Sequence, residues 1–156
     1  MINWSTVRLS REHVVWAVVA LFIVVLQWPM LKGTWYKRTG ATPPPSAIAW
    51  HTDIDTALEE AARLERPVLV DFAADWCPPC ITMKHDVWPE PAVVAAVQDG
   101  YVPLLIDVDT RPDVAARYDV SGIPSVMVLD EDGRVLRRTS SFLGAGAMAK
   151  FLREDL

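Results

Sequence analysis

The chain has 156 residues, of which 51% are hydrophobic, so it is long enough for one domain with its own core plus an appendage. Its formal net charge is −5 but unevenly spread, with +4 on residues 1–39 and −9 on residues 40–156. The acidic character of the larger part excludes nucleic acid as a partner, because nucleic-acid binding requires a basic face. Two cysteines are too few for a disulfide-stapled scaffold.

An apolar segment lies near the N-terminus, at residues 14–31. No charge follows before Lys32, and a helix of this length spans roughly 27 Å, close to the hydrocarbon thickness of a bilayer. Trp16 and Trp28 lie near its ends, where indole rings prefer the membrane interface. We therefore predict an N-terminal tail at 1–13 and a transmembrane anchor at 14–31. One alternative is a cleaved signal peptide, but no small-residue cleavage site follows the segment. The other is a buried core helix, but the segment is apolar all round and has no amphipathic stripe.

Residues 32–49 are predicted to be a linker, in which Pro43, Pro44 and Pro45 favour an extended, semi-rigid polyproline segment that holds the domain off the membrane. Basic residues flank the apolar segment on both sides, so the distribution of positive charge hardly discriminates its orientation. A solvent-facing dithiol is most useful for disulfide chemistry in an oxidising compartment. We therefore expect a single-pass protein of a bacterial inner membrane, whose domain at 50–156 faces the periplasm or another extracytoplasmic compartment.

Helical and strand patterns alternate along this domain. Helices are indicated by apolar periodicity, by Thr52 or Asp53 as an N-cap and by prolines at helix starts, and strands by short apolar runs rich in β-branched residues. This alternation predicts an α/β fold with a central mixed β-sheet flanked by helices. In chain order we expect a helix at 53–65, a strand at 68–73, helices from the cysteines to 84 and at 91–98, a strand at 101–108, a helix at 112–118, a hairpin of strands at 125–129 and 134–139, and a helix at 147–156.

The two cysteines, Cys77 and Cys80, lie directly after a predicted strand and at the start of a predicted helix. A helix N-terminus stabilises a thiolate through its free N–H groups and its dipole, and the thiolate is the nucleophile in thiol–disulfide exchange. One helical turn brings the second sulfur close enough to close a small ring, and Pro79 fits the first turn because its missing N–H is not needed there. The pattern predicts a redox-active Cys-x-x-Cys centre.

Asp71 is an acid in the middle of the apolar strand predicted at 68–73. An unpaired carboxylate in such a position is costly, and burial should raise its pKa. The alternative is a solvent-facing Asp on an edge strand.

Two stretches of the chain resemble the thioredoxin superfamily. Val70–Cys80 reads Val-Asp-Phe-Ala-Ala-Asp-Trp-Cys-Pro-Pro-Cys, and Val120–Ser125 reads Val-Ser-Gly-Ile-Pro-Ser. Residues 71–152 are most similar to the C-terminal thioredoxin-like domain of the bacterial disulfide reductase family DsbD, in which a similar helix, a proline break and an Asp-Val strand follow the cysteines. The resemblance covers roughly residues 50–156. It implies a thioredoxin-like fold and a thiol–disulfide oxidoreductase of the protein-disulfide reductase type.

The resemblance also implies catalytic roles for three residues. Cys77 would be the exposed cysteine that attacks a substrate disulfide, and Cys80 would resolve the mixed disulfide. Asp71 would be the buried acid that relays a proton to or from Cys80.

Five further residues are implied to bind substrate. Pro124, preceded by Ile123, matches the family's cis-proline, whose loop lies beside the disulfide and offers backbone groups to a bound peptide. Trp76 is expected to shield the disulfide and to form the docking surface together with Pro78 and Pro79.

No cofactor and no metal are expected. Two thiolates are too few for structural zinc, which takes four ligands, and the nearest histidine, His85, is expected to face solvent. Copper delivery by the dithiol and a non-catalytic protein-binding module remain as alternatives. The pair Pro78-Pro79 replaces the Gly-Pro of thioredoxin itself and tunes the redox potential, so the direction of electron flow stays open. Since the predicted anchor holds no cysteine, the expected partners are disulfide-containing protein substrates and a separate upstream redox partner.

Overall fold

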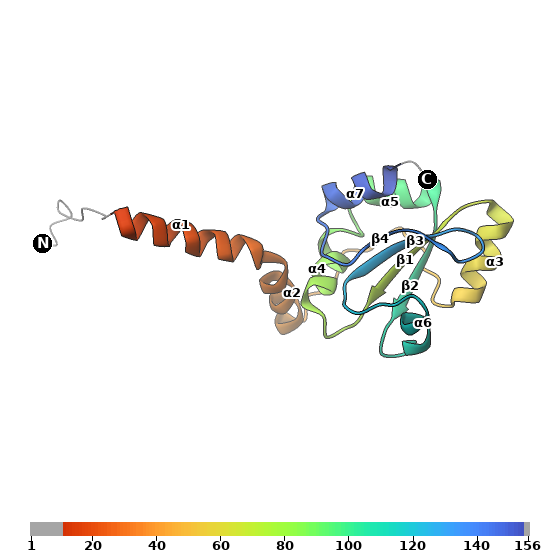
Figure 1. Ribbon diagram of the computed structural model, residues 1–156, viewed down its shortest axis with the longest axis horizontal. Helices are drawn as coiled ribbons and strands as arrows, with labels where there is room; N and C mark the ends of the chain where they lie inside the picture. The colour runs from red at the N-terminus through yellow and green to blue at the C-terminus, as the bar shows by residue number, and fades with distance from the viewer. Residues whose placement is uncertain (1–10, 155–156) are drawn as a thin grey trace, which may run out of the picture.

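The computed structural model describes residues 11–154 (Figure 1). Most of the tail predicted at 1–13, and the last two residues of the helix predicted at 147–156, lie outside the described residues. The elements in chain order are α1 Arg11–Leu26, α2 Trp28–Thr39, α3 Ile54–Leu64, β1 Val68–Ala73, α4 Pro78–Asp86, α5 Pro91–Gly100, β2 Val102–Asp107, α6 Pro112–Arg117, β3 Ser125–Leu129, β4 Val135–Thr139 and α7 Ala145–Arg153.

The strands form one mixed sheet in the order β2-β1-β3-β4. β1 runs parallel to β2 and antiparallel to β3, and β3 pairs with β4 as a hairpin. β3 is buried along its whole length and β1 at all but its last residue, because helices cover both faces of the sheet (Figure 1). The predicted α/β fold with a central mixed sheet flanked by helices is therefore confirmed.

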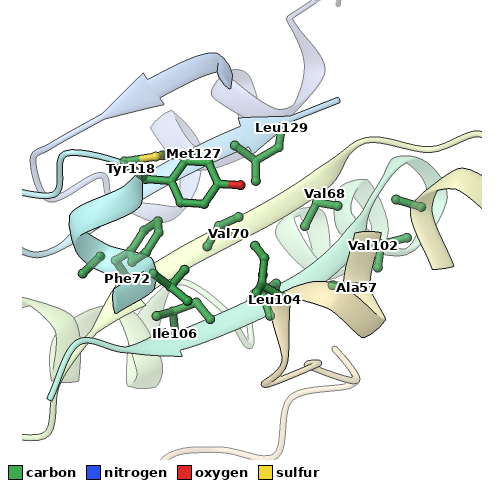
Figure 2. Packing of buried hydrophobic residues seen from close by; sticks show 14 residues of the cluster. Ala57, Val68, Val70, Phe72, Val102, Leu104, Ile106, Tyr118, Met127 and Leu129 are labelled. Carbon is green, nitrogen blue, oxygen red and sulfur yellow. The ribbon is translucent and has the colours of Figure 1, made fainter. Parts of the chain in front are cut away.

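Alternate side chains of β1 enter two different hydrophobic clusters, because successive residues of a strand point to opposite faces. Val68, Val70 and Phe72 pack with α3 and α6, in the cluster that Figure 2 shows. Leu69 packs with α4, α5 and α7 on the other face. Asp71 lies two residues after Leu69 and therefore points to this second face, so strand periodicity alone places an acid under α4.

Local signals set where the helices of the domain begin. Asp53 caps α3, since its Oδ1 accepts a hydrogen bond of 3.0 Å from the backbone N–H of Thr56. α4, α5 and α6 each carry proline in the first turn, where no intrahelical N–H is needed. From α3 onward, the ends of the helices and strands lie within two residues of those predicted, apart from the C-terminus of α7.

The N-terminal segment differs from the single straight span predicted at 14–31. No one helix among residues 11–154 is by itself long and apolar enough to cross a membrane, whereas α1 and α2 together satisfy the length and composition and are bent by 58° at the break between them. α1 projects away from the rest of the molecule (Figure 1), and its large apolar side chains from Val14 to Leu26 are exposed.

The region predicted as a linker begins as helix: residues 32–39 belong to α2 and pack against α4. Lys32 Nζ lies 2.6 Å from Asp86 Oδ2, and the Tyr36 hydroxyl donates a hydrogen bond of 2.9 Å to Asp86 Oδ1. The Tyr36 ring stacks on His85 with ring centroids 3.9 Å apart. His85 is therefore buried, and the prediction that it faces solvent is wrong, because a helix from the preceding segment covers that side of α4.

Candidate active site

The two cysteines form a disulfide at the start of α4, with their Cα atoms 5.3 Å apart. Cys77 is the N-cap of the helix, and its Sγ accepts a hydrogen bond of 3.2 Å from the backbone N–H of Cys80. Pro78 and Pro79 occupy the first two helical positions, which lack intrahelical acceptors for an N–H. The predicted position of Cys77 at a helix N-terminus is confirmed, and the backbone N–H of Cys80 in the first turn points toward its sulfur.

Cys77 is only 3% exposed, whereas the sequence predicts an exposed attacking cysteine. α2 lies against the first turn of α4 beside it. Gly33 approaches so closely that a Cβ there would overlap the carbonyl oxygen of Pro78, and the Thr82 hydroxyl donates a hydrogen bond of 2.7 Å to the Pro29 carbonyl. The expectation of an exposed Cys77 is therefore wrong for the disulfide form, and the Cys-x-x-Cys pattern also gives no sign that an earlier helix packs onto the same turn.

Asp71 is buried, with 4% of its surface exposed. Trp88 Nε1 donates a hydrogen bond of 2.8 Å to Asp71 Oδ2, while Oδ1 has no hydrogen-bond partner among the described residues. Burial raises the pKa of Asp71 to about 7, and the hydrogen bond from Trp88 opposes this rise by stabilising the ionised form. The predicted burial and raised pKa are confirmed, and the edge-strand alternative is wrong because β1 lies between β2 and β3.

A cavity of about 290 Å³ connects the buried acid to the redox pair. Asp71 and Cys80 both line this cavity. The rest of its wall is mostly apolar, apart from the charged residues Asp75, Lys84 and Asp107. A space of this size holds several water molecules, each of which takes about 30 Å³ in the liquid. The cavity therefore provides room for a water-mediated path between the carboxyl of Asp71 and the thiol of Cys80.

The Ile123–Pro124 peptide bond is cis, as the resemblance predicts. Pro124 is buried and immediately precedes β3, whose first residue, Ser125, is paired with Phe72 of β1 in antiparallel register. The cis-proline loop therefore lies at the end of the sheet from which β1 leads into the cysteines. Its predicted role in binding a peptide stays a prediction.

Trp76 stands next to the disulfide and is 56% exposed. Its Nε1 donates a hydrogen bond of 2.8 Å to Asp109 Oδ2, just beyond the end of β2, which ties the cysteine loop to the neighbouring strand. Pro78 and Pro79 are half-buried on the same loop-to-helix junction. The structure thus places an exposed aromatic surface beside the redox pair, and substrate binding by these three residues stays a prediction.

Sequence reasoning missed Trp88 and the α2 residues that contact α4. Trp88 lies two residues beyond the end of α4, where a tryptophan in an apolar context signals only packing. Within residues 11–154, no group of three or more His, Cys, Asp or Glu side chains is arranged to hold a metal ion.

The Thioredoxin-like family model matches residues 49–131, a stretch that contains both cysteines and the cis-proline. The chain is 34% identical over 121 residues to the thiol:disulfide interchange protein DsbD 2 of Pseudomonas aeruginosa, a match that covers 69% of this chain and 20% of DsbD 2. It is 25% identical over 137 residues to the thioredoxin-related protein DsbJ of Chlamydia pneumoniae, covering 80% of this chain and 38% of DsbJ. The chain thus spans well under half the length of these two relatives.

Among solved structures, the oxidised C-terminal domain of DsbD from Neisseria meningitidis is similar to this chain. The superposition has a TM-score of 0.56 and 25% sequence identity, and it covers 66% of this chain and 96% of that one. The similarity extends over nearly the whole of that domain, which agrees with the resemblance seen in the sequence motifs.

Proposed function

Because this chain belongs to the thioredoxin-like family of thiol–disulfide oxidoreductases, we propose that it is a membrane-anchored reductase of disulfides in extracytoplasmic proteins. The observation that carries the proposal is the placement of the Cys77–Cys80 disulfide at the N-terminus of α4, where Cys80 lines a cavity shared with the buried carboxyl of Asp71. This arrangement supplies a stabilised thiolate, a second thiol within one helical turn and a group that can take its proton.

The proposed reaction starts from the dithiol form. The Cys77 thiolate attacks one sulfur of a substrate disulfide, so a Cys77–substrate disulfide forms and the other substrate sulfur leaves as a thiolate. Asp71, ionised, accepts the proton of Cys80 through water in the shared cavity. The Cys80 thiolate then attacks Cys77 Sγ, which releases the second substrate thiolate and leaves the Cys77–Cys80 disulfide. Two electrons pass from this chain to the substrate, and each product thiolate takes up a proton from solvent.

The cycle needs a second partner, because the reaction ends with the oxidised pair. A dithiol on another protein would attack the Cys77–Cys80 disulfide by the same exchange and restore the dithiol form. The chain has no further cysteine that could pass electrons to this pair from within.

The proposal of an anchor is supported by α1. Its exposed side chains from Val14 to Leu26 are apolar all round the helix, and an exposed apolar surface of this extent marks contact with a membrane or another protein. Extraction of membranes at alkaline pH tests it: the full chain should stay in the membrane pellet. Release into the soluble fraction would contradict an integral anchor.

The side of the membrane can be tested with the chain's own two thiols. In intact cells treated with a reductant, a membrane-impermeant maleimide should label the wild-type chain and leave a Cys77→Ser/Cys80→Ser double variant unlabelled. Labelling that requires cell lysis would contradict an extracytoplasmic domain.

Activity is tested with the reduced full chain and a disulfide-bonded peptide that carries a fluorophore and a quencher. The wild type should separate the two halves, Cys77→Ser should be inactive, and Cys80→Ser should accumulate a mixed disulfide that is visible on a non-reducing gel. Equal rates for the wild type and Cys77→Ser would refute the proposed function and favour a binding module with an incidental dithiol.

A further inference from the structure

Trp88 makes a contact with the reaction machinery that no sequence motif indicates. It is 4% exposed, and its indole Nε1 donates the one hydrogen bond that the described residues offer to the Asp71 carboxyl. We propose that Trp88 is a positioning residue for proton transfer: by its hydrogen bond to Oδ2 it holds the Asp71 carboxyl on the wall of the cavity that Cys80 also lines, in place to exchange the proton of Cys80. The inference rests on the proposed function, in which Asp71 accepts that proton.

The chemistry of the indole group determines what Trp88 can do. An indole N–H is a donor only, so Trp88 cannot itself accept a proton from Cys80. By donating to Oδ2 at 2.8 Å it occupies one carboxylate oxygen and fixes the plane of the carboxyl group. The other oxygen, Oδ1, is buried and without a partner among the described residues, and Asp71, Cys80 and Trp88 all line the same cavity. Trp88 therefore sets the orientation of the acid beside the cavity that Cys80 shares.

Trp88 is itself held from two sides. Its ring packs edge-on against Trp50 with centroids 5.1 Å apart, and its backbone carbonyl accepts a hydrogen bond of 3.1 Å from the Ser46 hydroxyl. Both contacts come from the stretch between α2 and α3, where Ile48 is also buried in the same cluster. Ser46 and Ile48 lie in the predicted linker at 32–49 and Trp50 at the start of the predicted domain, and together they brace the tryptophan that orients Asp71.

The other charged residues that line the cavity are more exposed to solvent than Asp71. Asp75, in the loop after β1, and Lys84 of α4 are exposed, and Asp107 at the end of β2 is half-buried. The pKa of Asp71 is governed by its burial, which raises it, and by the hydrogen bond from Trp88, which lowers it. Loss of that bond should therefore raise the pKa of Asp71 further, since it stabilises the ionised form.

The expected size of the effect follows from the strength of such a bond. A hydrogen bond to an ionised group corresponds to a pKa change of about one unit or more. With a wild-type pKa of about 7, a rise of about one unit lowers the ionised fraction of Asp71 at neutral pH about fivefold. The rate of the step in which Cys80 resolves the mixed disulfide should fall by the same factor and should recover as the pH rises.

The experiment compares the full chain with Trp88→Phe, which keeps an aromatic ring but removes the donor. The matched control is Trp50→Phe, which changes the same cluster but no bond to Asp71. Release of substrate from the mixed disulfide is followed in a single turnover as a function of pH. Trp88→Phe should shift the midpoint of the profile upward by about one unit, and Trp50→Phe should not. An equal midpoint in Trp88→Phe and the wild type, or an equal shift in both variants, would overturn the proposal.

A second measurement needs no variant of Trp88. In the oxidised wild type, the nuclear magnetic resonance signal of the Trp88 indole N–H should titrate with a midpoint near 7, and this titration should be lost in Asp71→Asn. An indole signal that does not change with pH would overturn the proposal even if Trp88→Phe fails to fold. A different result would contradict the proposed function itself: a wild-type chain that does not reduce the substrate at all.

Discussion

The buried carboxyl of Asp71 should make the oxidised protein less stable as the pH rises. Its pKa is raised from 3.8 in the unfolded chain to about 7 in the native state, chiefly by burial. Between these two values the native state keeps a proton that the unfolded chain has released, so the free energy of unfolding decreases with rising pH. A difference of about three pKa units corresponds to about 4 kcal/mol, all of which is lost once the pH exceeds the native pKa.

Replacing Asp71 with Asn removes this cost, because the amide does not ionise and its oxygen can still accept the hydrogen bond from Trp88. Asp71→Asn should therefore be about as stable as the wild type below about pH 4 and more stable by up to about 4 kcal/mol above about pH 8. Its single-turnover reduction of substrate should be slower, because no group then takes the proton of Cys80.

The assay is urea denaturation of the oxidised full chain, followed by tryptophan fluorescence across this pH range. Asp75→Asn is the control, since it removes a carboxylate that lines the same cavity at an exposed position. A difference between Asp71→Asn and the wild type that is constant with pH, or that favours the wild type in alkaline solution, would refute the reasoning.

Two further substitutions test the packing around the site. Gly33→Ala should push α2 off α4, because the added methyl overlaps the backbone carbonyl of Pro78. The separation breaks an ion pair and a stacked ring pair, each worth on the order of 1 kcal/mol. Alkylation of the reduced Cys77 should therefore become about tenfold faster. Thr34→Ala on the exposed side of α2 should leave that rate unchanged, and equal rates for the two variants would contradict a covering role of α2. Leu104→Ala, at a fully buried position of β2, should lower the free energy of unfolding by about 2–5 kcal/mol in the same denaturation assay, whereas Val135→Ala at a position 38% exposed should cost far less.

The positions of the two cysteines and the burial of Asp71 could be predicted from the sequence, because they depend on one helical turn and on one strand. Cys77 and Cys80 share one helical turn, and the proline at the helix start indicates where that turn begins. The burial of Asp71 follows from its place in an uninterrupted apolar run, since such runs belong to strands covered on both faces. The cis peptide before Pro124 follows from the family resemblance and has no local signature of its own.

The contacts that sequence reasoning missed are those between segments far apart in the chain. Trp88 and Asp71 are separated by 17 positions, and only the packing of the α4 end onto β1 brings them together. His85 is buried because Tyr36, 49 positions earlier, stacks on it. Hydropathy identifies residues 14–31 as apolar, but a bend between α1 and α2 and the contact of α2 with α4 depend on tertiary packing that no periodicity reveals.

The reduction potential of the Cys77–Cys80 pair tests the central claim most directly. The full chain is equilibrated with thiol–disulfide buffers of graded potential, its free thiols are alkylated, and the oxidised fraction is read by mass. A disulfide reductase should give a value near −270 mV, about that of thioredoxin. A value near −120 mV, about that of a strong disulfide oxidant, would contradict the proposed direction of electron flow.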